Sequence, residues 1–364
     1  MPAGSGLIRR RTLLQTVGAG FAGVTAFGRG MAASPTNIAD IAGDPEALYS
    51  ILVGGPPDGR VDRWTRAAAL GMQPALSGHQ PIRLRAIGGQ DGVTGANRLQ
   101  TLDVPDGHTA AMLPGEVIIA FLVGDPRVHF QPGEWIPVMA GLNAALMILR
   151  GGLARLSNSA PIRLAAASLE SPDLAAILAL RRLGARTVPV FGLRDPAAAS
   201  RAFASGEVDA ILLTGEDVSA DAAPLTAEGG VPIGTLGVVD GKGEVVRDPL
   251  FPHLPTIHEI AGKRGVPDLP QPLDHAYRAV AAASRIDFML ILPHLTTSAQ
   301  VAVWRQAAIA AIATPAMRSA ASASTIDLAA DGAAASALAP IGLPTGALLA
   351  LREFMFQQFG WHPS

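Results

Sequence analysis

The sequence contains no cysteine. This absence excludes structural disulfides, thiolate-bound metal sites and a cysteine nucleophile. It also excludes a lipid-modified cysteine, so we expect no membrane anchor of that kind. Charged residues make up only 16% of the chain, and the formal net charge is −2. Because the sequence has no dense basic stripe, we expect no nucleic-acid partner.

Apolar runs long enough to cross a membrane without interruption are also missing. Hydrophobic residues are instead dispersed along the chain and make up 49% of its 364 residues. That content is ample for buried cores and argues against a disordered chain. A chain of this length usually forms more than one compact unit, and we expect two lobes.

Basic residues cluster in one place, the N-terminus. Residues 9–11 are three arginines, residues 13–27 form a short apolar stretch diluted by glycine, and no acidic residue occurs before Asp40. This order is typical of an export signal, and residues 10–14 match the twin-arginine pattern. We therefore predict that residues 1–33 are a twin-arginine-type export signal and that the mature protein is free in the periplasm.

Beyond the signal, the sequence alternates apolar strands, glycine-containing loops and helices. Strands are predicted over residues 50–53 and 82–87, and the helices that follow them over 62–70 and 94–102. Strand, glycine loop and helix in repeated order predict an α/β fold with a parallel sheet and ligands near the strand ends.

The middle of the chain repeats this order, and the end of the chain differs from it. A strand (163–167), a turn (168–171) and a helix (172–183) are followed by strands at 187–191, 210–213 and 234–239 and a helix at 196–204. Residues 267–272 are proline-rich and predict a connection. The alanine-rich C-terminal part predicts a helix over 298–317 and a loose low-complexity segment over 319–339.

The glycine loops at residues 54–60 and 88–92 each lead into a predicted helix. A helix N-terminus presents unpaired N–H groups and a partial positive charge, and glycine lets a ligand approach the backbone closely. Neither the P-loop lysine nor the dinucleotide glycine spacing occurs at these loops. The loops therefore indicate a site for carboxylates or other polar ligand atoms, but by themselves they are a weak signal.

Several short motifs occur in the order and at the spacing of a known family. The chain resembles the substrate-binding proteins of tripartite tricarboxylate transporters, the Bug family, between residues 50 and 295. The segments that carry the resemblance are 56–62 with Arg66, 89–96, 105–109, 168–172, Phe191-Gly192, 206–209 and 254–259.

The resemblance implies a two-lobe periplasmic binding protein of the type II kind, with a ligand cleft between the lobes and hinge closure. Residues 48–148 would form the first part of lobe 1, 149–270 lobe 2, and 271–364 the second part of lobe 1. It implies no cofactor and no metal, a small-molecule ligand, and delivery to membrane permease subunits by a protein that we expect to be a monomer. Carried over by position, the ligand contacts would be Pro57, Asp58, Gly59, Gly89, Gln90, Asp91, Gly92 and Thr94 on lobe 1, with Ser168, Ser171 and Phe191 on lobe 2.

The chain departs from the family where it carries Asp58, Asp91 and Glu170, since family members usually have small residues there. If all three faced the cleft, they would oppose a di- or tricarboxylate, and the ligand would be neutral, cationic, or a monocarboxylate offset by Arg60. Alternatively, these acids lie near helix starts, where carboxylates are favoured, and point to solvent. The sequence leaves both interpretations open, and we include Arg60 and Glu170 among the candidate contacts.

The sequence argues against an enzyme without excluding one. Its histidines are scattered, and neither the zinc-protease spacing nor the nucleophile-elbow motif occurs. A hydrolase built on Ser168 and a sensor or adaptor that uses the same fold remain alternatives. Asp62 and Arg66, four residues apart on one predicted helix, are expected to hold the first loop in place.

Overall fold

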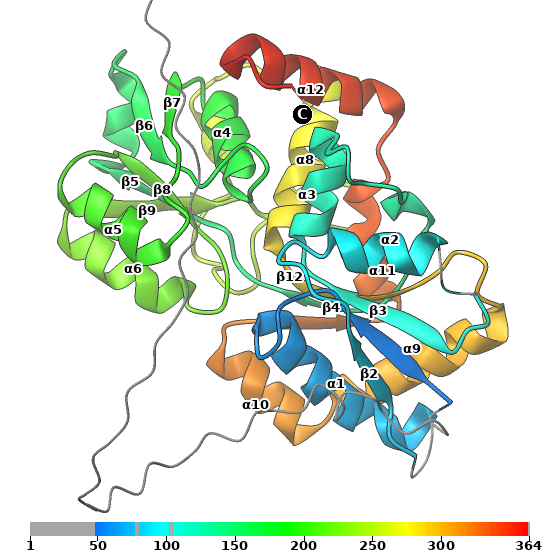
Figure 1. Cartoon of the computed structure of the whole chain (residues 1–364). Coiled ribbons are helices and arrows are strands. Elements are labelled where there is room, and N and C mark those ends of the chain that lie inside the picture. The colour runs from blue at the N-terminus through cyan, green and yellow to red at the C-terminus, as the bar shows by residue number, and fades with distance from the viewer. Residues whose placement is uncertain (1–47, 77–79, 102, 104, 363–364) are drawn as a thin grey trace, which may run out of the picture. The chain divides into compact units, whose positions relative to one another are not determined.

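Two mixed β-sheets organise the chain. The computed structural model describes residues 48–76, 80–101, 103 and 105–362, all within one compact unit, Ala39–Ser364. The predicted export signal lies outside these residues. The first sheet has the strand order β13-β4-β12-β3-β1-β2, and the second has the order β7-β6-β8-β5-β9 (Figure 1).

The strands of the first sheet are β1 (Ser50–Val53), β2 (Arg83–Ala86), β3 (Thr109–Leu113), β4 (Ile136–Leu142), β12 (Ile286–Leu292) and β13 (Asp327–Ala330). Those of the second are β5 (Leu146–Arg150), β6 (Ile162–Ala165), β7 (Thr187–Val190), β8 (Ala210–Leu213) and β9 (Gly230–Thr235), and β10 (Val238–Val239) and β11 (Val245–Val246) form a hairpin. The helices are α1 (Arg60–Leu76), α2 (Val93–Thr101), α3 (Glu116–Val123), α4 (Asp173–Arg182), α5 (Pro196–Ala204), α6 (Val218–Ala227), α7 (Ile257–Lys263), α8 (Gln271–Arg285), α9 (Ser298–Ile312), α10 (Pro315–Ala323), α11 (Gly332–Leu338) and α12 (Thr345–Phe359), with 3₁₀ turns η2 (Pro132–Glu134), η3 (Gly152–Ser157) and η4 (Ala339–Ile341).

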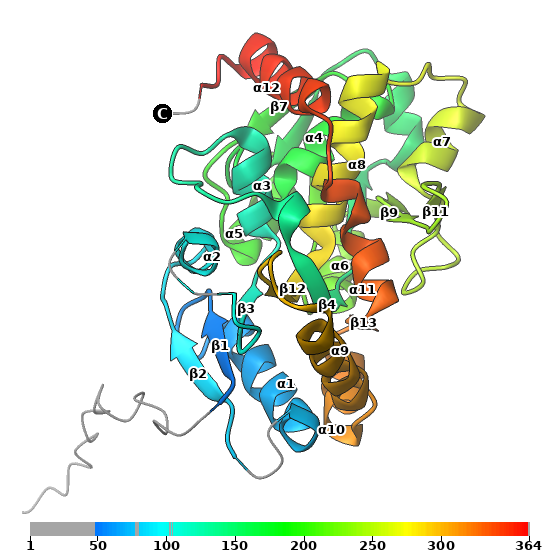
Figure 2. The ribbon, with the colours of Figure 1, turned by 90° about the vertical axis from the view of Figure 1, so that its right-hand side faces the viewer.

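Alternation along the central strand β12 explains why the first sheet carries helices on both faces. All seven residues of β12 are buried; Phe288 and Leu290 join the core formed with α1, α9 and α10, whereas Met289 and Ile291 join the core formed with α2, α3 and α8. Successive side chains of a strand point to opposite faces, so a strand with helices on both sides is apolar throughout. Figure 2 shows α1, α9 and α10 grouped together, in agreement with their contacts.

The second sheet follows the same rule at β8. Ala210 and Leu212 belong to the core that includes α4, and Ile211 and Leu213 to the core formed with α5 and α6. Helices α5 and α6 therefore lie together on one face (Figure 1). The predicted strand at 210–213 and the helix at 196–204 coincide with β8 and α5.

The prediction of parallel sheets is only partly correct. Strands β1, β2 and β3 pair in parallel, as do β6, β7 and β8, but β12 is antiparallel to β3 and β4, and β5 is antiparallel to β8 and β9. The strand predicted at 234–239 is also two pieces, because Gly237 has φ +80° and ends the extended run between β9 and β10.

The low-complexity segment at 319–339 is not loose. It contains the end of α10, strand β13, which pairs with β4, and helix α11. The single helix predicted at 298–317 is broken at Pro315, the first residue of α10, where the hydroxyl of Thr314 accepts the N–H of Met317. These elements were not predicted because the segment is rich in alanine, which gives no periodic pattern of large apolar side chains.

The chain passes between the sheets twice, first through residues 143–145 and again between β9 and β12. The predicted boundary between residues 148 and 149 falls inside β5, which pairs with β8 and β9. The run from Val138 to Leu149 is almost continuously apolar, so the sequence carries no turn signal at the crossing. In the described part of the chain no single helix could span a membrane, and one bent pair, Gly332–Ile341 with Thr345–Phe359, could do so by length and composition alone.

Candidate functional site

The loop between β1 and α1 is fixed by a buried carboxylate. Asp62 is 5% exposed and accepts the backbone N–H of Asp58 at 2.9 Å, while Arg66 donates to it at 3.0 Å. Asp58 itself has φ 57°, a left-handed conformation that aspartate tolerates better than most residues. These contacts agree with the structural role expected for Asp62 and Arg66. Pro57 and the Asp58 side chain are exposed, and Gly59 is half-buried.

The loop between β2 and α2 brings the second group of predicted residues to the start of a helix. Gly92 has φ +77°, and a Cβ there would lie 2.7 Å from the Cδ of Pro114, so this position requires glycine. Gly89, Gln90 and Thr94 are exposed. The loop therefore presents backbone and short polar side chains to solvent just before α2.

Asp91 in this loop has two partners within the first-sheet part of the chain. Its Oδ1 accepts the N–H of Val93 at 3.2 Å, and its Oδ2 lies 2.7 Å from Nη2 of Arg127. Arg127 also binds Asp125, and its hydrogen bonds to the two carboxylates raise the pKa of Arg127. Of the two interpretations of the acidic residues, these contacts favour the helix-start interpretation for Asp91. Asp58 and Glu170 are exposed, and no hydrogen bond to either carboxylate is formed by the described residues.

Arg60 lies between two carboxylates rather than facing solvent alone. Its Nη2 is 3.3 Å from Oε1 of Glu116, and its Nε is 3.2 Å from Oδ1 of Asp287. Asp287 is fully buried at the start of β12. Burial raises the pKa of Asp287 to about 6 against the attraction of Arg60, and the charges of Glu216 and Glu116 raise it further. Arg60 is therefore already neutralised and does not offer a free charge to a carboxylate ligand.

The second-sheet residues gather in the loop between β6 and α4. The Ser171 hydroxyl donates to the carbonyl of Ser168 at 2.7 Å and lies 2.9 Å from Oδ2 of Asp173. That oxygen also accepts the N–H of Ala167 at 2.8 Å, and burial raises the pKa of Asp173. The serines therefore order this loop through contacts within it.

A cavity of about 200 Å³ lies at the carboxyl ends of β6 and β8. Its polar lining is Ser171, Asp173, Arg194, Thr214 and Asp221, and its other walls are apolar. Of the predicted second-sheet contacts, only Ser171 belongs to this lining; Phe191 follows β7 and is 47% exposed. Arg194 is exposed, and its side chain pairs with none of the described residues.

Glu216, in the loop after β8, connects this part of the second sheet to helix α1. Its carboxylate accepts the indole N–H of Trp64 at 2.9 Å and lies 2.7 Å from Nη2 of Arg63, and both of these residues belong to α1 of the first-sheet part. Sequence reasoning missed the functional candidates Arg63, Trp64, Glu116, Glu216 and Asp287. Of these residues, only Glu116 has a local sequence signal, because it directly follows Pro114-Gly115 at the start of a helix.

The described residues form no serine–histidine pair at Ser168. Its hydroxyl accepts the N–H of Glu170 at 3.1 Å, and no described histidine hydrogen-bonds to Ser168 or Ser171. Among the residues that the structure describes, no group of three histidine or carboxylate side chains could hold a metal ion.

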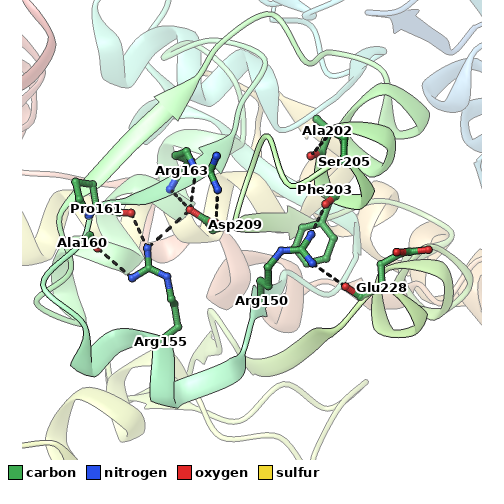
Figure 3. A network of polar contacts seen from close by, with 10 residues as sticks. All are labelled: Arg150, Arg155, Ala160, Pro161, Arg163, Ala202, Phe203, Ser205, Asp209 and Glu228. Atoms are coloured by element: carbon green, nitrogen blue, oxygen red, sulfur yellow. Dashed lines mark hydrogen bonds and ion pairs between the residues drawn. The ribbon is translucent and has the colours of Figure 1, made fainter.

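The segment 206–209, part of the family resemblance, makes contacts at the amino ends of two interior strands of the second sheet (Figure 3). Asp209 accepts two hydrogen bonds from the Arg163 side chain, at 2.7 and 3.0 Å, and one from the Arg163 backbone at 3.0 Å. These bonds lower the pKa of Asp209 although burial opposes them. Asp209 and Arg163 lie at the amino ends of β8 and β6, at the opposite ends of these strands from the cavity.

The raised pKa of Asp287 predicts a pH dependence of stability. Its pKa of about 6 exceeds the ordinary 3.8, so the folded chain holds this proton more tightly than the unfolded chain, and stability from this group is lost as pH rises from about 4 through 6. A difference of this size corresponds to about 3 kcal/mol. Relative to Asp287→Asn, the wild type should lose about this much unfolding free energy between pH 4 and 7.5, measured by urea unfolding. An equal pH slope in both proteins would contradict the assignment, and Glu259→Gln at an exposed ion pair is the control.

Solved structures with a similar fold are solute-binding proteins. A TctC solute-binding protein from Polaromonas, without ligand, has 16% identity and a TM-score of 0.61, covering 86% of this chain and 99% of its own. MatC from Rhodopseudomonas palustris, with bound malate, has 19% identity and a TM-score of 0.51, with coverage of 85% and 99%. The periplasmic binding protein BugD has 18% identity and a TM-score of 0.51, with coverage of 86% and 98%. No family model and no curated protein sequence matches the chain.

At this level of identity the similarity shows the fold. The chain has the two-lobe α/β fold of periplasmic solute-binding proteins, which confirms the predicted fold class. The neighbours are TctC and Bug proteins, as the sequence motifs suggested, and they are binding proteins.

Proposed function

We propose that the chain is a periplasmic solute-binding protein that captures a small organic molecule between the loops of its two sheets and delivers it to a membrane permease of the tripartite type. The observation that carries the proposal is the geometry of these loops. Loops with glycine and exposed polar groups follow β1 and β2, a cavity follows β6 and β8, and Glu216 connects the loop after β8 to helix α1. No reaction is proposed, because a binding function needs only differential contact with the solute in the closed form.

We propose that solute contacts come from the residues predicted on sequence grounds. The exposed backbone around Gly89 and Gln90 and the N-terminus of α2 would receive polar atoms of the solute. Ser171 and the neighbouring cavity would contact its other end. Pro57, Asp58, Gly59, Arg60, Asp91, Gly92, Thr94, Ser168, Glu170 and Phe191 complete the proposed set.

The charge balance favours a solute without net negative charge. Arg60 is shared by Glu116 and Asp287, and Arg127 is shared by Asp91 and Asp125, so each of these two cations faces two carboxylates. Arg194, whose side chain has no partner among the described residues, shares the lining of its cavity with two carboxyl groups, Asp173 and Asp221. Asp58 and Glu170 add exposed negative charge to the same loops. A di- or tricarboxylate would meet this excess at short range, whereas a neutral, zwitterionic or cationic solute would not.

A melting-temperature screen of the purified protein tests this function. The panel contains dicarboxylates, tricarboxylates, amino acids, polyamines and neutral aromatics. A solute at a hundred times its dissociation constant should stabilise the fold by about 2.7 kcal/mol. We expect a shift with solutes that lack net negative charge. A shift with di- or tricarboxylates alone would overturn the charge argument, and no shift with any compound would contradict the binding function. Phe191→Ala should weaken binding, while Phe356→Ala, the same truncation at nearly equal exposure on α12 (48% against 47%), should not.

A further inference from the structure

The contact made by Glu216 is a specific link between the second-sheet loops and α1. We use the name Glu216 bridge for Glu216 with its two partners, Trp64 and Arg63, at 2.9 and 2.7 Å. Its acceptor comes from the loop after β8, and its donors lie on the first turns of α1. The bridge therefore spans the two parts of the molecule that each carry half of the proposed solute site.

The indole bond is the better defined of the two. The Trp64 side chain is buried, with 4% of the residue exposed, and its ring stacks on Phe288 of β12 with centroids 4.8 Å apart. This packing fixes the direction of the indole N–H, and a buried donor without a partner is costly. Arg63 is 57% exposed, so solvent screens its pairing with Glu216. The indole N–H of Trp64 is thus a preorganised donor to one particular carboxylate, that of Glu216.

The bridge also lies beside the loops of both sheets. Glu216 is close enough to Arg60 and Asp287 for its charge to raise the pKa of both groups. On the other side, its loop begins with Thr214, which lines the cavity after β8. Movement of Glu216 would therefore displace the cavity wall relative to the loop that starts α1.

We propose that Glu216 is a positioning residue that holds the second-sheet loops against α1 before the solute arrives, and so increases solute affinity. When only a fraction of the protein is in the binding-competent arrangement, the apparent dissociation constant rises by the inverse of that fraction. Loss of the bridge lowers that fraction. The part of the proposal that concerns affinity rests on the proposed solute-binding function, and the part that concerns geometry does not.

The absence of cysteine allows the geometry to be measured in the intact chain. Spin labels at Leu70→Cys on α1 and Ala220→Cys on α6, both exposed, report the distance between the two parts without a solute. With Glu216 intact we expect one narrow distance distribution. Glu216→Ala should lengthen and broaden it, and Trp64→Phe, which keeps the ring and removes only the N–H, should do the same. Asp217→Ala, the adjacent exposed carboxylate, is the matched control and should change nothing.

Solute affinity is the second readout. For a solute identified in the melting screen, Glu216→Ala should raise the dissociation constant by about tenfold, because a smaller fraction of the free protein is binding-competent. Glu216→Gln, which can still accept from Trp64, should fall between the wild type and Glu216→Ala. Unchanged spin-label distances in both Glu216→Ala and Trp64→Phe would overturn the bridge. Altered distances with unchanged affinity would overturn its role in binding. If no solute binds, the proposed function fails, and the distances alone decide whether the bridge holds the loops.

Discussion

Asp248→Ala should lower the free energy of unfolding by about 3–5 kcal/mol, because it leaves Arg285 as a buried charge without its ion-pair partner. Nη2 of Arg285 and Oδ2 of Asp248 are 2.9 Å apart, and the side chains are 4% and 0% exposed. Arg285 is the last residue of α8, and its carbonyl accepts the N–H of Asn143 at 2.8 Å. The pair therefore connects the segment after β11 to the end of α8. Through Asn143, it also connects to residues 143–145, where the chain first passes between the sheets.

Chemical unfolding of three variants tests this prediction. Glu259→Ala removes an ion pair with Arg247 that is largely exposed to solvent, since the Arg247 and Glu259 side chains are 43% and 31% exposed. This substitution should lower the free energy of unfolding by less than about 1 kcal/mol. Asp248→Leu combined with Arg285→Met removes both charges and should recover most of the stability lost by Asp248→Ala. Similar losses for Asp248→Ala and Glu259→Ala would mean that the buried pair is not critical.

Gly115→Ala should destabilise the protein by about 3 kcal/mol and disturb the site as well. A Cβ at Gly115 would lie 2.1 Å from the carbonyl oxygen of Ala283 and 2.7 Å from that of Ile286. Backbone atoms cannot rotate away as a side chain can, so the start of α3 must move. Glu116, the next residue, would then lose its 3.3 Å contact with Arg60.

Thermal unfolding should distinguish this clash from a general effect of replacing glycine. Gly262 lies inside α7, and a Cβ there would meet nothing within 4 Å. Gly262→Ala should therefore be neutral or stabilise the fold by up to about 1 kcal/mol, since alanine favours the helix. If Gly115→Ala is as stable as Gly262→Ala, the close packing at the start of α3 is not required.

Local patterns predicted the elements well where apolar residues and helix starts were clear. Strand β1 and helix α5 coincide with the predicted ranges, since each combines a strong apolar or helical pattern with a nearby turn signal. Strand β13 was missed because Asp327–Ala330 has only one large apolar residue, and it becomes a strand by pairing with β4. The direction of each strand could not be predicted from local sequence patterns either, because β12 is antiparallel to β3 and β4, which are distant from it in sequence.

Only part of the candidate site could be predicted from the sequence. Glycine loops and helix starts could be placed, because they follow from neighbouring residues. The partners that decide the charges could not, since Arg127 is distant in sequence from Asp91, and Asp287 and Glu116 reach Arg60 only through the pairing of β12 and β3. From residue types alone, Asp91 was expected to repel a carboxylate solute and Arg60 to offset that repulsion. In the fold, each of these two residues already has a partner of opposite charge.

Hydrogen exchange with and without a solute that raises the melting temperature tests the central claim most directly. If the solute is held between the loops of the two sheets, amides in residues 54–60 and 88–94 and amides in residues 166–173 and 191–194 should all exchange more slowly when it is bound. The predicted result is protection on both sides at the same solute concentration. Protection confined to one sheet, or located away from these loops, would contradict the account.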